Sequence, residues 1–174
     1  ECARRIGDFA RNLPEGRWIT GGDWDHELWG GELPRREWID SLTTEHPVFV
    51  SRLDGHMALV NSVALEMAGI TADTPDPEGG TIVRDPESGE PAGVLKDNAM
   101  SLVSRMIPEP SEAELDEAFE RAQAHALSLG VTLVNDMGAW SHLETYRRAR
   151  RRGDLKVRIY SFVPLGTWER LRDY

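Results

Sequence analysis

The chain has 174 residues, of which 40% are apolar and 29% are charged, so it can form at least one ordinary globular domain with its own core. Its formal net charge of −10 argues against a nucleic-acid partner, because phosphate binding requires a basic face, and no apolar run approaches the roughly 20 residues that cross a bilayer. A single cysteine excludes an intrachain disulfide and is compatible with a reducing compartment, so we expect a cytoplasmic protein.

The first part of the chain predicts short elements separated by loops. Residues 1–12 have an amphipathic helical pattern; they carry neither an initiator Met nor a leader, so we expect the sequence to begin inside a longer protein. A short strand is predicted over 17–22, and a short helix begins at Pro34, where proline suits the first turn. Alternation and β-branched residues then predict a strand over 47–53.

The middle of the chain is rich in turn residues. After the Asp54-Gly55 turn and His56 comes a short helix, with Asn61 as its N-cap and Gly69 as its C-terminal stop. The segments 80–85 and 91–95 flank a Glu-Ser-Gly-Glu turn and predict a hairpin. This region shows no internal repeat.

The last part of the chain alternates long helices with clean strands. A helix over 111–130 opens with the capping-box pattern of Ser111 and Glu114. Its expected apolar stripe consists of Leu115, Ala118, Phe119, Ala122 and Ala126. Strand 131–137, helix 140–154 and strand 155–163 follow, and this order is typical of a parallel sheet in an α/β barrel or a doubly wound fold. The basic cluster at 146–156 is interpreted as a solvated helix end.

The segment GGDWDHELWGG, residues 21–31, has the highest density of polar and aromatic side chains. As a metal site it would offer Asp23, Asp25, His26 and Glu27. Their consecutive positions suit neither a helix face nor the usual spacing of zinc ligands. As a carbohydrate platform, the segment offers indole faces beside carboxylates. The favoured interpretation is a structural loop in which Trp24 and Trp29 fill the core and one or two side chains reach the edge of a pocket.

Polar residues at strand ends are the other candidates. His56 follows a strand and is either a cap of a backbone carbonyl in the turn or a functional group. Asn135 and Asp136 end a parallel strand, which is where α/β proteins place functional groups. Lys96 and Asp97 follow another strand and are candidates for the same reason. The alternative interpretation is that they lie at the solvated start of a helix. The remaining histidines are interpreted as structural, with His125 as a half-buried packing residue.

Four phrases in register resemble one known family. They are GGDWDHELWGG, SRLDGHMALVNSVALEMAGI, DTPDPEGGTIVRDPESGEPAGVLKDNAM and SLGVTLVNDMG. Together they are similar to the YtcJ-like branch of the amidohydrolase superfamily (amidohydrolase family 3), which includes N-substituted formamide deformylase. The resemblance runs from about Arg17 to Val163.

The resemblance implies a fold and a chemistry. The fold would be α/β, a partial (β/α)8 TIM barrel with a large, loop-rich α+β insertion after barrel strand 1. Residues 1–16 would be a barrel helix, 17–105 the insertion that covers the barrel mouth, and 106–174 the early barrel units with strands 2 and 3. Zinc or another divalent metal would activate water for attack on an amide-type carbonyl. The family's His-x-His pair, modified lysine and later histidines have no counterpart here, so we expect neither a metal ligand nor a catalytic residue in this chain.

The resemblance implies that this chain supplies residues that contact the substrate, while the metal ligands lie elsewhere. The expected substrate-pocket residues are Trp24, Asp25, His56, Asn61, Lys96 and Asp136. We therefore expect a piece of a metal-dependent hydrolase of non-peptide C–N bonds that acts on a small molecule and is inactive alone. The alternative is a binding module, directed to carbohydrate by its Trp and carboxylate groups. Unpaired strand edges also favour a homodimer.

Overall fold

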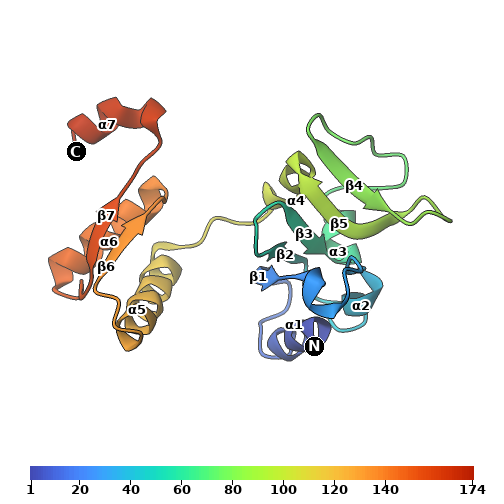
Figure 1. Ribbon diagram of the computed structural model, residues 1–174, viewed down its shortest axis with the longest axis horizontal. Coiled ribbons are helices and arrows are strands. Elements are labelled where there is room, and N and C mark those ends of the chain that lie inside the picture. The colour runs from blue at the N-terminus through green and yellow to red at the C-terminus, as the bar shows by residue number, and fades with distance from the viewer. The chain divides into compact units, whose positions relative to one another are not determined.

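The computed structural model describes residues 1–174, and the chain divides into two compact units, Glu1–Pro108 and Glu109–Tyr174 (Figure 1). Each unit is described by itself. The fold is mixed α/β, as expected. The predicted division at 16 and 105 into parts of a barrel stays a prediction. The helix at the start of the chain packs within the first unit. No helix is both long and apolar enough to span a membrane.

The first unit contains a five-stranded sheet in the order β1-β2-β3-β5-β4. The strands are β1 Ile19–Trp24, β2 Val48–Arg52, β3 Met57–Val60, β4 Gly80–Arg84 and β5 Pro91–Asp97. Strand β1 is parallel to β2, and the other neighbours are antiparallel. The helical segments are α1 Cys2–Ala10, η1 His26–Trp29, α2 Glu37–Asp40, α3 Ser62–Met67, η2 Asn98–Met100 and α4 Ser101–Ser104.

Both faces of this sheet are buried. Successive side chains of a strand point to opposite faces, so Val48 and Val50 join a different cluster from Phe49 between them. On one face, Ile6 of α1 and Ile39 of α2 pack against the sheet. The residues packed on the other face include Ala64, Leu65, Ala99 and Val103, from α3, η2 and α4. This two-sided burial explains why the central strands read as continuous apolar runs.

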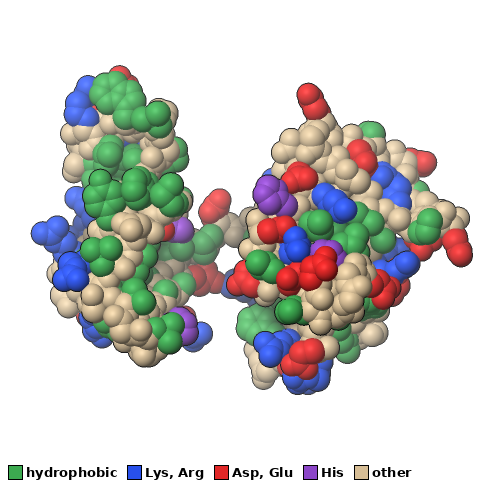
Figure 2. Space-filling model, in the orientation of Figure 1, with side chains coloured by type: hydrophobic (Ala, Val, Ile, Leu, Met, Phe, Trp, Pro, Cys, Tyr) green, Lys and Arg blue, Asp and Glu red, His purple; other side chains and the backbone are tan.

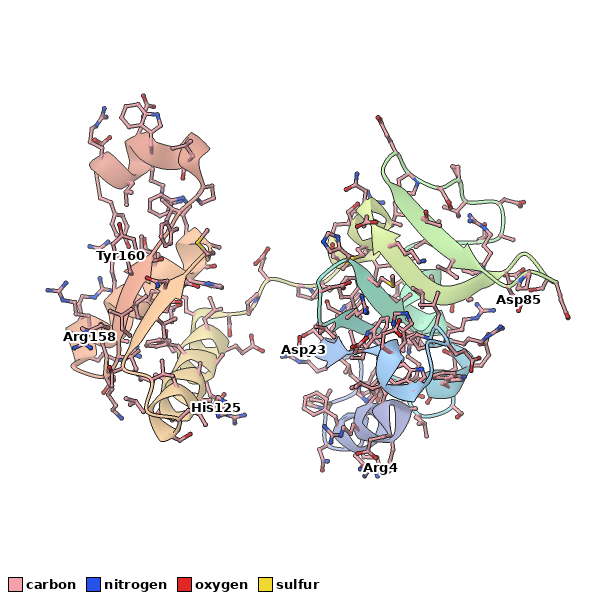
Figure 3. All side chains as sticks on the ribbon, in the orientation of Figure 1. Arg4, Asp23, Asp85, His125, Arg158 and Tyr160 are labelled. Carbon is pink, nitrogen blue, oxygen red and sulfur yellow. The ribbon has the colours of Figure 1, made fainter.

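Strand β3 is the main addition to the predicted elements. The sequence predicts no element over 57–60, because four apolar residues between a turn and a helix show no alternation. In the structure they pair with both β2 and β5. The predicted hairpin of β4 and β5 is confirmed. Its turn is held by Asp85 (labelled in Figure 3), whose carboxylate accepts bonds from the backbone N–H groups of Ser88 and Glu87.

The second unit contains the predicted parallel pair of strands. Strands β6 Leu133–Asp136 and β7 Arg158–Ser161 pair in parallel, as expected. The helical segments are α5 Glu112–Ser128, α6 Trp140–Arg152, η3 Leu165–Thr167 and α7 Trp168–Arg172. The capping box of α5 is confirmed, with both Ser111 and Glu114 hydrogen bonds formed.

Burial in the second unit differs from the prediction. Within the expected stripe of α5, Ala118 and Ala122 are exposed and the other three residues are only half-buried. His125, expected to be half-buried, is exposed as well. A sheet of two strands offers too little surface to cover a long helix, so the periodicity predicts the helix correctly but not its burial. The basic cluster is also only partly a solvated helix end, because Arg148 and Arg152 of α6 both bind Asp116 of α5.

Candidate functional site

Three chain segments meet at one edge of the first unit's sheet. They are the end of β1, the turn between β2 and β3, and the end of β5, as the register pairs Trp24 with Arg52 and Met57 with Lys96. We call this region the polar edge, and it consists of Asp23, Asp25, Arg52, Asp54, His56 and Asp97. It contains both non-glycine residues with a positive φ angle, Asp23 at +58° and Asp97 at +48°. Such backbone strain tends to occur at functional sites.

Arg52 joins two acidic groups of the polar edge. Its Nη2 atom donates to Asp25 Oδ1 at 3.0 Å, and its Nη1 atom donates to Asp54. The hydrogen bond from Arg52 holds the pKa of the Asp25 carboxyl below its usual range. Asp25 also accepts from the backbone N–H of Glu27 and so caps η1. The nearby His26 Nδ1 and Arg52 Nε atoms are buried and have no hydrogen-bond partner, which is uncommon in a folded protein.

His56 lies on the exposed side of the polar edge. Its Nδ1 atom is 2.8 Å from Asp97 Oδ1, and its backbone N–H donates to Asp54 Oδ1 at 3.0 Å. The ring therefore binds a carboxylate and is not the cap of a backbone carbonyl in its turn. The side chain is 73% exposed, so Asp97 orients an imidazole that solvent or a ligand can reach. The hydrogen bond that Asp97 accepts from the ring raises the pKa of His56.

The His56–Asp97 pair predicts a pH-dependent contribution to stability. Because the pKa of His56 is raised in the folded chain, the contribution is present below the unfolded pKa of about 6.5 and is lost as pH rises through the folded value. In an NMR titration, we expect His56 to titrate above the ordinary value and to move back toward it in Asp97→Asn. An unchanged titration in that variant would contradict the pairing.

Trp24 and Asp25 lie together on the wall of a pocket. Trp24 is 5% exposed, and its Nε1 atom donates to Val50 O at 2.7 Å. The pocket has a volume of about 680 Å³ and lies between the first turn of α1, the segment from Gly22 to Trp29, and Trp38. Trp29 was expected to fill the core but is 36% exposed, so of the two indoles only Trp24 is a core residue.

Asn61 is a structural residue of the first unit. It is completely buried, and its Oδ1 atom accepts from the backbone N–H groups of Val48 and Ala64. Its Nδ2 atom lies within hydrogen-bond distance of Thr43 O, Thr43 Oγ1 and His46 O. The predicted N-cap is therefore confirmed. Every polar atom of the amide is satisfied, so a substrate contact would require one of these bonds to break.

The last two predicted pocket residues lie in different places. Lys96 is a half-buried residue of β5, next to Asp97, and the structure brings it to the polar edge. Asp136 belongs to the second unit, at the end of β6, where its Oδ2 atom is 3.5 Å from Ser161 Oγ and 3.6 Å from His142 Nδ1. Burial and a hydrogen bond with Asp136 raise the pKa of Tyr146.

Sequence reasoning missed the partners that organise the polar edge. Arg52 is not among the predicted residues. Asp97 is a candidate in the sequence, with a helix start as the alternative, but it is not among the expected substrate-pocket residues, and its partner His56 lies 41 positions away. No local pattern reveals such a pair. The metal interpretation of residues 23–27 gains no support, since no three His, Cys, Asp or Glu side chains of this chain come together in a way that could hold a metal ion.

Comparison with known proteins adds a family to this geometry. The sequence profile of the Amidohydrolase family matches residues 1–172. Protein LONG AFTER FAR-RED 3 of Arabidopsis thaliana is 44% identical over 99% of this chain and 31% of its own length. Putative amidohydrolase YtcJ of Bacillus subtilis is 32% identical over 92% of this chain and 32% of its own length. N-substituted formamide deformylase of Arthrobacter pascens is 34% identical over 89% of this chain and 30% of its own length.

A solved structure supports the fold. The crystal structure of an uncharacterized metal-dependent hydrolase from Pyrococcus horikoshii has a TM-score of 0.64 to this chain at 23% identity, and it covers 99% of this chain and 33% of that one. The chain therefore spans about a third of the length of each of these relatives.

Proposed function

The chain belongs to the amidohydrolase family, and from that membership we propose that the longer protein is a metal-dependent hydrolase of non-peptide C–N bonds. The observation that carries this proposal is the match of nearly the whole chain, together with its 34% identity to a deformylase of N-substituted formamides. In this proposal, residues 17–105 form the insertion over the mouth of a (β/α)8 barrel. Strands β6 and β7 would be the second and third strands of that barrel.

We propose that a divalent metal, zinc or another, takes part in the reaction of the longer protein. A bound metal of this kind lowers the pKa of water and polarises a carbonyl. The residues of this chain do not form a site for it, so its ligands would come from other parts of the longer protein. The 174 residues alone are therefore expected to show no metal-dependent amidase turnover.

The role proposed for this chain is to shape the substrate pocket. The wall formed by Trp24 and Asp25 supplies apolar surface beside a charged group, a combination typical of small-molecule sites. His56, oriented by Asp97 and exposed, is placed to donate a hydrogen bond to a substrate oxygen. Binding through both groups would position the amide without either of them contacting the metal.

His56→Asn in the full-length protein tests this role. Turnover of an N-substituted formamide is expected to fall about tenfold or more in kcat/KM, the effect of losing a hydrogen bond to a charged group. Metal content, measured by mass spectrometry, is expected to remain unchanged. His125→Asn, a change of an exposed histidine on α5, is the control and should leave turnover unchanged. Loss of metal in His56→Asn would overturn the role, and a metal-loaded parent that hydrolyses no amide would overturn the function.

The geometry gives less support to the carbohydrate-binding alternative. Sugar stacking needs an exposed indole face, whereas Trp24 is 5% exposed and its N–H group is already bonded to Val50. Trp29 and Trp38 are each 36% exposed, and their ring centroids lie 6.3 Å apart in an edge-to-face arrangement that offers no flat platform. A glycan titration that Trp24→Ala abolishes would favour the alternative.

We further propose that the chain by itself self-associates through its second unit. Apolar side chains cover much of the visible face of this unit in Figure 2. The large apolar side chains of this unit that are at least 40% exposed are Leu129, Val131, Leu133, Met137, Tyr160, Phe162, Leu165, Trp168 and Leu171. Exposed apolar surface of this kind favours association. Light scattering is expected to show a mass above 19.5 kDa that rises with concentration, and a monomer at high concentration would contradict the proposal.

A further inference from the structure

The pocket of the first unit has aromatic walls. Trp24, Trp29 and Trp38 all line it, with ring centroids 6.4 Å apart for Trp24 and Trp29 and 6.3 Å apart for Trp29 and Trp38. The faces of indole rings carry negative charge density and attract cations. The volume of about 680 Å³ accommodates a small organic molecule.

The charges on the pocket wall are acidic in sum. They come from Glu1, Arg5, Asp23 and Asp25. Arg5 is paired with the Glu1 carboxylate, which lies 3.0 Å from its Nε atom and also binds Arg4, and Asp25 is paired with Arg52. Asp23 has no ion-pair or hydrogen-bond partner. The wall therefore holds one uncompensated carboxylate beside three indoles.

The backbone fixes the position of Asp23. The pairing of β1 with β2 is interrupted between Gly22 and Trp24, so Asp23 is the extra residue of a β-bulge. Its φ angle is +58°, a conformation that aspartate and asparagine tolerate better than most residues. Figure 3 shows Asp23 at the end of β1. The bulge thus presents this carboxylate to the pocket, although nothing in the first unit binds it.

We propose that this pocket binds a substituted ammonium ion. The positive nitrogen is held by the Asp23 carboxylate, and its alkyl or aryl groups contact mainly Trp29 and Trp38, which are each 36% exposed, with the small exposed part of Trp24 behind them. A carboxylate ligand is disfavoured by the net acidic wall, and a neutral apolar ligand leaves Asp23 unused. Hydrolysis of an amide C–N bond releases an amine that is protonated at neutral pH, so the bound ammonium ion would be the reaction product. Only this identification of the ligand as the product rests on the proposed function. The binding itself is independent of turnover.

The experiment uses choline as the probe and the chain of 174 residues as the protein. Its control ligand is the uncharged isostere of choline, in which tert-butyl replaces trimethylammonium. Tryptophan fluorescence is titrated with each ligand. We expect choline to bind about tenfold or more tightly than the isostere, as expected for a cation over indole faces beside a carboxylate. Equal binding of the two ligands, or no binding of either, would overturn the proposal.

Substitutions at two positions, Asp23 and Trp29, separate the contributions of the charge and of the aromatic ring. Asp23→Asn keeps the positive φ angle and removes the charge, so it should abolish most of the preference for choline while the thermal midpoint stays unchanged. Trp29→Leu should weaken choline binding more than Trp29→Phe, because phenylalanine keeps an aromatic face. Asp73→Asn, at an exposed site of the same unit, is the matched control. A preference that survives Asp23→Asn would overturn the proposal, whether or not the full-length protein hydrolyses amides.

Discussion

Asn61→Ala is expected to lower the free energy of unfolding of the first unit by about 3 to 5 kcal/mol, because several buried backbone groups lose their partners at once. The amide caps α3 through Ala64 N and also bonds to Val48 N, at the start of β2. Loss of an N-cap alone costs about 1 kcal/mol. The remainder comes from the N–H of Val48 and the carbonyl of His46, which lose their side-chain partner at buried residues, whereas the Thr43 carbonyl keeps the His46 N–H as a donor.

Hydrogen exchange measures this loss within the first unit. The amides of Val48 and Ala64 are expected to exchange much faster in Asn61→Ala, and the midpoint of urea unfolding should fall. Asn98→Ala is the matched control, because the Asn98 amide donates one hydrogen bond, at 2.8 Å to Glu78 O, at an exposed site. This control should cost about 1 kcal/mol or less. Equal losses for the two variants would show that Asn61 does not connect α3 to β2.

Gly22→Ala is expected to distort the pairing of β1 with β2 and to destabilise the first unit by about 3 kcal/mol or more. A Cβ atom at this position would lie 2.6 Å from Ser51 O and 2.8 Å from Ser51 N, closer than real contacts allow. The φ angle of +129° adds strain for any residue with a side chain. Because these contacts are with backbone, the strand itself must move, and the Asp23 bulge must move with it.

Gly21→Ala separates the two causes. Gly21 also has a positive φ angle, +100°, but no atom lies within 4 Å of the position that a Cβ atom would take, so only backbone strain of about 1 to 2 kcal/mol is expected. The difference between the two variants in urea unfolding gives the steric cost. In NMR spectra, the Trp24 indole N–H, which donates to Val50 O, should shift in Gly22→Ala and remain in place in Gly21→Ala. Similar losses in both would contradict a close contact at Ser51.

The contacts within the polar edge depend on the same pairing of strands that stabilises the first unit. Asp25 and Arg52 meet because β1 and β2 are in parallel register, and His56 meets Asp97 because β3 and β5 are antiparallel. Substitutions that shift β1 are therefore expected to affect both the ion pair and the pocket. Surface changes such as Asp73→Asn leave both intact.

Short-range interactions account for the features that could be predicted from the amino-acid sequence. The capping box of Ser111 and Glu114, the Asn61 cap of α3, and the hairpin turn before Pro91 all involve partners within a few positions. The alternation of helix and strand after 111 likewise predicted the parallel pair β6 and β7. The four family phrases predicted the amidohydrolase family, which the match over residues 1–172 confirms.

Long-range contacts, visible only in the folded chain, determine which residues come together and which are buried. They pair β3 with the distant strand β5, and they place Asp97 against His56 across 41 positions. They also enclose Asn61, whereas Ala118 and Ala122 of the predicted stripe are not buried. The physical reason is that hydrophobic periodicity fixes the face of a helix or strand, while burial and pairing depend on neighbours that are distant in the chain.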